Sequence, residues 1–125
     1  MNALNMAKTA YGASQTPIRT PRSTEYEAFA RITHRLKATA EKGRAGFSEL
    51  AQAIHDNRTL WTMLAADVSD PANGLPQQLR AQIFYLAEFT NHHSQQVLKG
   101  AETVAALMEV NIAIMRGLRM QEAAA

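Results

Sequence analysis

The sequence predicts an all-α fold, a small bundle of about five helices, and three observations support this prediction. Alanine, the strongest helix former and a poor strand former, occurs 23 times in 125 residues. Only six glycines and four prolines interrupt the chain. Apolar side chains recur at three- and four-residue steps in several segments, the spacing of one buried helix face. A chain of this length can bury a core of its own as a single domain.

The first 20 residues are predicted to form a mobile arm and linker. Residues 1–11 suit a short helix, with Asn2 as N-cap and with Leu4, Tyr11 and the alanines roughly on one side. Gly12 ends this helix, and the polar, proline-containing stretch 12–20 reads as a linker. We expect an arm on such a linker to become ordered on a partner.

The bundle is predicted to begin with a long helix from Pro21, a residue suited to the first helical position. A capping box at residues 24–27 is a competing start. Gly43 and Gly46 bracket the helix end and a short turn. The next region, residues 47–68, contains two apolar stripes separated by the polar run at 55–58, which predicts two helices with a break near 55–57. One continuous helix is the alternative.

Residues 70–76 form the clearest loop, because Asp-Pro and Asn-Gly are turn dipeptides. The following helix is expected to run from Pro76 to about Lys99, with Gly100 just past its end.

The last helix is expected from residue 102 or 103 to about Arg119. Asn111 interrupts its apolar stretch, and is either buried and hydrogen-bonded or turned to water. The predicted division is therefore an arm and linker over 1–20, a bundle over 21–120 and a tail over 121–125.

Several function classes are excluded or disfavoured. The absence of cysteine excludes disulfides, thiolate metal sites and a cysteine nucleophile. The histidines lack zinc-ligand spacing, and the chain has no glycine-rich phosphate loop and no nucleophile elbow. We therefore predict no enzyme activity, no metal and no cofactor. Neither a membrane span nor a secretion signal is recognisable, so we expect a cytoplasmic protein.

Charge is unevenly distributed along the chain. Residues 1–44 carry a net charge of +5, and residues 45–125 carry −3. A basic N-terminal third is compatible with contact to RNA or to an acidic protein surface, and equally with a solvated helix face.

The few aromatic side chains are the best candidates for a partner surface. Trp61 is either a core anchor or the centre of an interface. Phe84, Tyr85 and Phe89 lie on one helix, which is either buried on two sides or borders an exposed groove that receives a partner helix.

Four stretches resemble the FlaF family of flagellar biosynthesis regulators. They are Tyr11 followed by residues 20–29 (TPRSTEYEAF), residues 56–61 (DNRTLW) with 67–68, residues 73–81 (NGLPQQLRA) and residues 109–118 (EVNIAIMRGL). The resemblance implies a role in flagellin synthesis or export beside the translational regulator FlbT, as a flagellin-binding chaperone. It transfers no catalytic residue.

From the resemblance and the aromatic pattern we expect an apolar groove that holds a helical flagellin segment. Trp61, Phe84, Tyr85 and Phe89 are expected to form the groove, and Tyr11 and Tyr26 to close it. The alternatives are a regulator that binds flagellin mRNA directly, with the two tyrosines stacking on bases, and a scaffold that only recruits FlbT.

Overall fold

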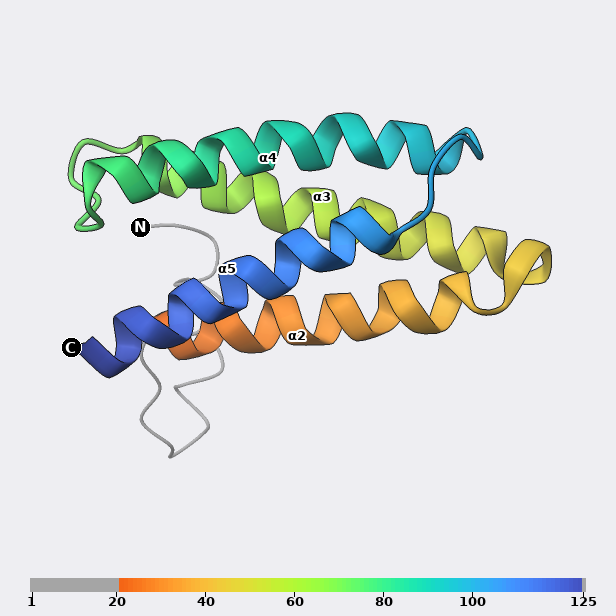
Figure 1. The fold of residues 1–125 in the computed structure, drawn as a ribbon, viewed down its shortest axis with the longest axis horizontal. Helices are drawn as coiled ribbons and strands as arrows, with labels where there is room; N and C mark the ends of the chain where they lie inside the picture. The colour runs from red at the N-terminus through yellow and green to blue at the C-terminus, as the bar shows by residue number, and fades with distance from the viewer. Residues whose placement is uncertain (1–20, 125) are drawn as a thin grey trace.

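The computed structural model describes residues 21–124, which form four long α-helices (Figure 1). They are α2 (Pro21–Ala40), α3 (Phe47–Ser69), α4 (Gln77–Leu98) and α5 (Ala105–Ala124), with a short 3-10 helix, η1 (Gly43–Gly46), between α2 and α3. The described residues contain no strand, so the all-α prediction is confirmed. The predicted arm helix at 1–11 lies outside the described residues.

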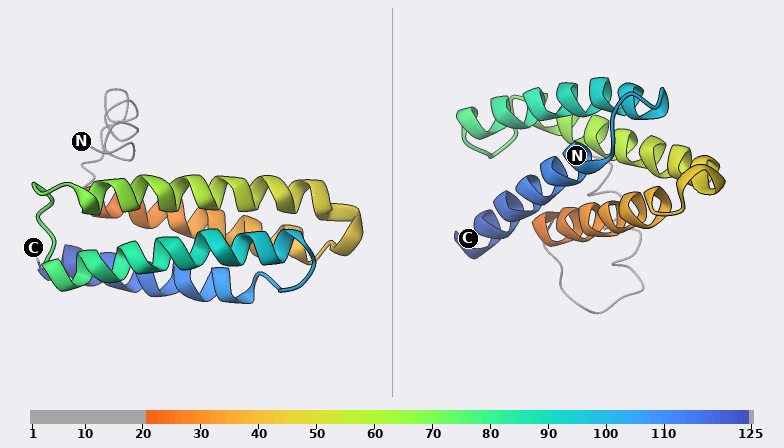
Figure 2. Two further views of the ribbon diagram at one scale, coloured as in Figure 1. Left: turned by 90° about the horizontal axis from the view of Figure 1, so that it is seen from above. Right: turned by 45° about the vertical axis from the view of Figure 1, so that its right-hand side comes forward.

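The helices pack unequally. Helix α5 lies along α2, and α3 packs on both α2 and α4. By contrast, α4 and α5 share few contacts. Figures 1 and 2 show α5 crossing in front of the bundle, with the start of α4 and the end of α5 at the same end of the molecule. The side where α4 faces α5 is therefore the least tightly closed side of the bundle.

The predicted break near residues 55–57 is wrong, because α3 continues through it. The polar side chains of this run bind three other helices and do not cap a new helix start. Asp56 pairs with α2, Arg58 hydrogen-bonds to α4, and Asn57 accepts a hydrogen bond from α5. Because these side chains bond to other helices, they do not compete for the backbone groups of α3, and the helix continues.

The ion pair between Asp56 and Arg35 also shifts the pKa of the Asp56 carboxyl. Arg35 Nη1 lies 2.7 Å from Asp56 Oδ2. This hydrogen bond holds the pKa of the Asp56 carboxyl below its usual value, with a smaller contribution from Gln52.

Local signals define the helix ends, as the sequence predicts. Helix α2 begins at Pro21. Gly100 follows α4 with φ +81°, and its N–H donates to the Val97 carbonyl at 2.9 Å, while the Ala101 N–H donates to the Gln96 carbonyl. These two bonds make a Schellman motif, which needs a left-handed residue and so favours glycine.

The loop before α4 and the start of α5 rely on side-chain caps. Asp70 and Asn73 each accept a backbone N–H two residues ahead, at 2.9 and 3.0 Å. Thr103 Oγ1 accepts the Ala105 N–H at 3.3 Å, so Thr103 caps α5. Helix α5 continues to Ala124 and includes most of the segment that we expected to be a tail.

The apolar core has two clusters, one toward each end of the bundle. The first contains Phe29, Leu60, Trp61, Leu64, Val68, Leu75, Ile83, Ala87, Ile114 and Leu118, and the second contains Leu36, Ala53, Ile54, Val97, Val104 and Leu107.

A polar layer lies between these clusters along the helices, and every long helix contributes to it. Its members are Thr33, Asn57, Thr90, Ser94 and Asn111. Asn111 is fully buried at its centre: its Oδ1 accepts from the Trp61 indole at 2.8 Å, and its Nδ2 donates to Asn57 Oδ1 at 2.8 Å and to Thr33 Oγ1 at 3.0 Å. The layer thereby connects α2, α3 and α5 through directed bonds.

Candidate functional site

Trp61 lies in the core and not on a partner surface. Its side chain is 1% exposed, its indole donates to Asn111, and its ring meets Phe29 edge-on with centroids 5.3 Å apart. Of the two roles that the sequence allows for Trp61, the structure supports the core anchor. Trp61 cannot contact a partner while the bundle stays closed.

Tyr26 lies on α2 and contacts the end of α5. Its hydroxyl accepts a hydrogen bond from Arg119 at 2.8 Å, and the same guanidinium lies 5.0 Å from the centre of the Tyr26 ring. This contact joins the start of α2 to the end of α5. Tyr26 is therefore not placed to close a groove beside α4, and Tyr11 lies outside the described residues.

The three aromatic side chains of α4 fall on two sides of the helix. Phe84 lies at helical spacing from Arg80 and Asn91, both of which bind α3: Arg80 donates to the Val68 carbonyl and Asn91 accepts from Arg58. Phe84 is 44% exposed on that side.

Tyr85 and Phe89 lie on the other side, at helical spacing from His93. The ring of His93 stacks on Phe89 with centroids 5.3 Å apart, and its Nε2 lies 3.1 Å from the Thr103 carbonyl just before α5. His93 therefore lies next to the residues that precede α5, whereas Tyr85, two turns earlier, is 69% exposed. The structure brings Tyr85 and Phe89 together, and it separates them from Phe84.

Helix α5 opposes this side of α4 with small and apolar residues. Its buried positions, Ile114 and Leu118, point into the core, and Arg119 lies toward α2. At 100° per residue, Val110 and Gly117 lie beside the buried stripe on the side away from Arg119, and Ala113 and Met120 lie on the outer face of α5. Met120 is 71% exposed, and Ala113 is exposed as well.

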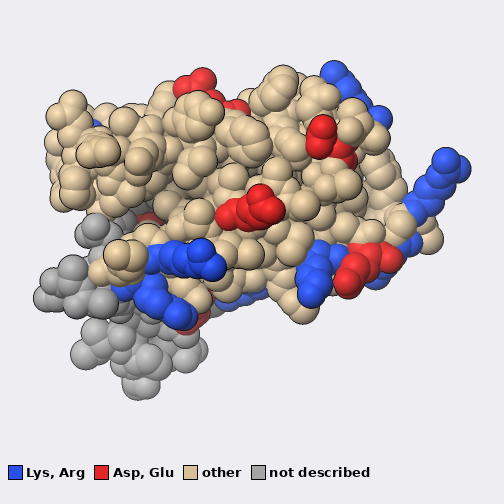
Figure 3. Space-filling model, viewed as in Figure 1, with Lys and Arg blue, Asp and Glu red and all other residues tan. Residues whose placement is uncertain are grey.

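We call the facing surfaces the α4–α5 seam. It comprises Gln78, Gln82, Tyr85, Leu86 and Phe89 of α4 with Val110 and Gly117 of α5. None of these residues carries a charge. Figure 3 shows the corresponding uncharged area over the first half of α4, with basic side chains gathered below it near the end of α5.

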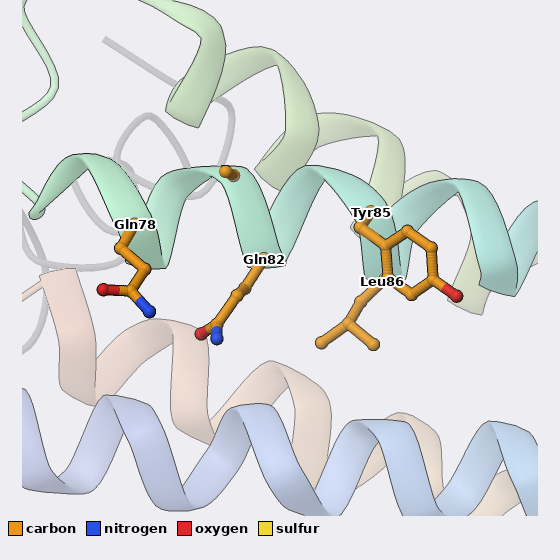
Figure 4. Close-up of a pocket in the computed structure, with 5 residues that line it drawn as sticks. Gln78, Gln82, Tyr85 and Leu86 are labelled. Atoms are coloured by element: carbon orange, nitrogen blue, oxygen red, sulfur yellow. The ribbon is translucent and has the colours of Figure 1, made fainter.

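An open hollow of about 550 Å³ lies against α4, lined by Gln78, Ala81, Gln82, Tyr85 and Leu86. In Figure 4, the side chains of Gln78, Gln82 and Leu86 point from α4 toward α5. Tyr85 borders the hollow with 69% of its surface exposed. Apolar walls with two amides suit a helix that presents an apolar stripe and a few polar groups.

A smaller hollow of about 310 Å³ lies on the other side of α4. Its lining includes Val68, Gln77, Arg80, Ala81 and Phe84. Arg80 there donates to two carbonyls at the end of α3, so its guanidinium serves the helix end.

Sequence reasoning missed the contribution of α5. Its signal was present: Val110 and Gly117, seven residues apart, lie beside the buried stripe. This pair is easily overlooked because glycine carries no side chain.

No three His, Asp or Glu side chains come together as metal ligands within residues 21–124. Over the same residues, no helix is both long enough and apolar enough to cross a membrane.

Comparison with known proteins identifies the family. The model of the family described as "Flagellar protein FlaF" matches residues 7–118, nearly the whole chain. Neither a protein of curated function nor a solved structure matches. Because this match covers nearly the whole chain, including α4 and most of α5, the chain belongs to the FlaF family of flagellar proteins.

Proposed function

We propose that this flagellar protein binds a helical segment of flagellin in the α4–α5 seam. In the cytoplasm it would hold flagellin for export and link flagellin supply to translation. The observation that carries this proposal is the uncharged, incompletely closed seam, where Tyr85 exposes 69% of its surface beside an open hollow. Within the described residues, only Met120 is a more exposed large hydrophobic side chain.

The seam suits a cargo that is helical when bound. An amphipathic segment laid between α4 and α5 would bury its apolar stripe against Tyr85 and Leu86, and burial of one such side chain contributes about 1.5–3 kcal/mol. Because the cargo must lose conformational freedom as it binds, the net affinity is lower than the buried area suggests. A lower net affinity favours release at the export step.

Calorimetry with purified protein and monomeric flagellin tests the proposal. We expect saturable binding, and we expect Tyr85→Ser to weaken it at least tenfold while the helical content stays unchanged. Phe47→Ser is the matched control, because Phe47 is 50% exposed but begins α3 at the far end of the bundle. No binding at tens of micromolar flagellin would contradict the proposed function, and equal loss in both variants would contradict the site.

Direct RNA binding is the second candidate, and the exposed basic side chains favour it. Arg31 and Lys37 on α2 and Arg116 on α5 are exposed, and Figure 3 shows basic groups over the end of α5. A filter-binding titration of flagellin mRNA at two salt concentrations distinguishes this candidate, since phosphate contacts weaken steeply with salt.

FlbT is a further partner that we propose on the strength of the family resemblance. Co-purification of FlbT with this protein in the presence and absence of flagellin tests it. Retention of FlbT without flagellin would support the scaffold role.

A further inference from the structure

We infer that α4 is a movable wall of the seam: it separates from a unit formed by α2, α3 and α5, and thereby admits the helical cargo. This inference rests on the proposed function, because it names the conformational step that the same site requires. A helix with its side chains is about 10–12 Å across. Since α4 and α5 still contact each other, such a helix lies fully between them only after α4 has moved.

The polar layer does not hold α4 in place. Its directed bonds join α2, α3 and α5 through Asn111, and among the described residues none of them reaches α4. Helix α4 contributes Thr90 and Ser94, which are 1% and 0% exposed. Within residues 21–124, the hydroxyl oxygens of both residues, and the Nδ2 atom of Asn57 on α3, have no hydrogen-bond partner.

These three atoms lower the cost of moving α4. A buried polar group without a partner raises the free energy of the closed bundle, and it recovers its hydration when water reaches it. Outward movement of α4 exposes Thr90 and Ser94 directly, and it uncovers Asn57 on the facing helix. The closed bundle is therefore destabilised where α4 meets the rest of the core.

The buried face of α4 is also weakly apolar. Two of its five buried positions carry hydroxyl groups and a third is Ala87, so only Ile83 and Val97 bury larger apolar side chains. The neighbouring α3 buries a tryptophan, two leucines, an isoleucine and a valine. Because hydrophobic stabilisation grows with the apolar area removed from water, α4 is held less strongly than α3.

The remaining attachments of α4 are accessible to water. It packs mainly on α3, and Figure 1 shows it on the opposite side of the bundle from α2. Its side-chain hydrogen bonds to the rest of the described chain involve Arg80, Asn91 and His93, none of which is buried. The segment 99–103 that follows it is exposed throughout. Elements with few buried contacts open at a low free-energy cost.

Hydrogen exchange of the full-length chain tests the movement. We expect the backbone amides of α4 to be at least tenfold less protected than the central amides of α3, because α4 exchanges through its own opening. Equal protection of the two helices would overturn the inference.

The double variant Thr90→Val, Ser94→Ala tests the cause. It replaces both unpartnered hydroxyls with apolar groups of similar size, so we expect exchange of the α4 amides to slow at least tenfold. Thr39→Val is the matched control, since the buried Thr39 hydroxyl donates to the Arg35 carbonyl at 2.7 Å, and its loss should not slow α4. Unchanged or faster exchange in the double variant would show that its two hydroxyls are satisfied in the closed bundle, and would overturn the inference.

Flagellin binding tests what the opening is for. Apparent affinity is proportional to the fraction of molecules in the competent state. We therefore expect the double variant to bind flagellin more weakly by about the factor by which its α4 exchange slows. Unchanged affinity beside slowed exchange would overturn the inference. If flagellin binds neither the native chain nor the variant, the proposed function is wrong, and the exchange rates still decide whether α4 moves.

Discussion

Replacing Asn111 with alanine should destabilise the fold far more than any exposed Asn→Ala change. In the native bundle, Asn111 Oδ1 accepts from the Trp61 indole at 2.8 Å and its Nδ2 donates to Asn57 Oδ1 at 2.8 Å. All three side chains are at most 1% exposed, so water cannot replace the lost bonds. Each orphaned buried group costs about 1–3 kcal/mol, which amounts to about 2–6 kcal/mol for the two partners.

This loss is large against the roughly 5–15 kcal/mol that stabilises an ordinary domain. Urea denaturation followed by fluorescence measures it directly, because Trp61 is the only tryptophan and moves from the core into water on unfolding. At a slope of about 2 kcal/mol per molar urea, the midpoint should fall by about 1–3 M.

Asn91→Ala is the matched control. Asn91 also accepts a side-chain hydrogen bond, from Arg58 Nε at 2.9 Å, but it is exposed on α4. Water satisfies the Arg58 guanidinium after the change, so we expect a loss below about 1 kcal/mol. If Asn111→Ala costs no more than Asn91→Ala, the buried hydrogen bonds of Asn111 do not stabilise the fold.

Three further predictions concern the seam, a helix end and an ion pair. Phe84→Ser should weaken flagellin binding by at most about threefold in calorimetry, because Phe84 lies on the α3 side of α4; a loss equal to that of Tyr85→Ser would show that the site extends around the helix. Gly100→Ala should lower stability by about 1 kcal/mol or more in urea, since φ is +81° there, whereas Gly74→Ala, in open space at an ordinary φ, should not. The pKa of Asp56 is lowered in the folded state, so the contribution of its ion pair to the free energy of unfolding is present above the unfolded pKa and is lost as pH falls through the folded pKa. Asp56→Asn should therefore lower stability at pH 7 by less than about 1 kcal/mol, because the pair is partly exposed, and should not lower it at about pH 2. An equal loss of stability at both pH values would contradict the assignment.

Parts of the fold that depend on neighbouring residues follow from the sequence. The start at Pro21, the loop at 70–76 and the left-handed Gly100 each involve groups within a few positions of one another. Such short-range interactions are encoded locally.

The division of the α4 aromatics illustrates where local reasoning ends. Adjacent residues on a helix point about 100° apart, so Phe84 and Tyr85 cannot share one groove unless a neighbour wraps around both. Which of them borders a hollow depends on where α3 and α5 lie. The sequence indicated an aromatic surface on this helix, and only the packing separated its two sides.

The sequence by itself determined that this chain is helical, where most of its helices begin and end, and which family it resembles. The tertiary structure decided that α3 runs unbroken, that Trp61 is buried, and that α4 and α5 leave an uncharged seam between them. The physical reason is distance along the chain: Trp61 and Asn57 meet Asn111 from 50 and 54 residues away. Helical periodicity identifies buried faces, but only the assembled bundle selects their partners.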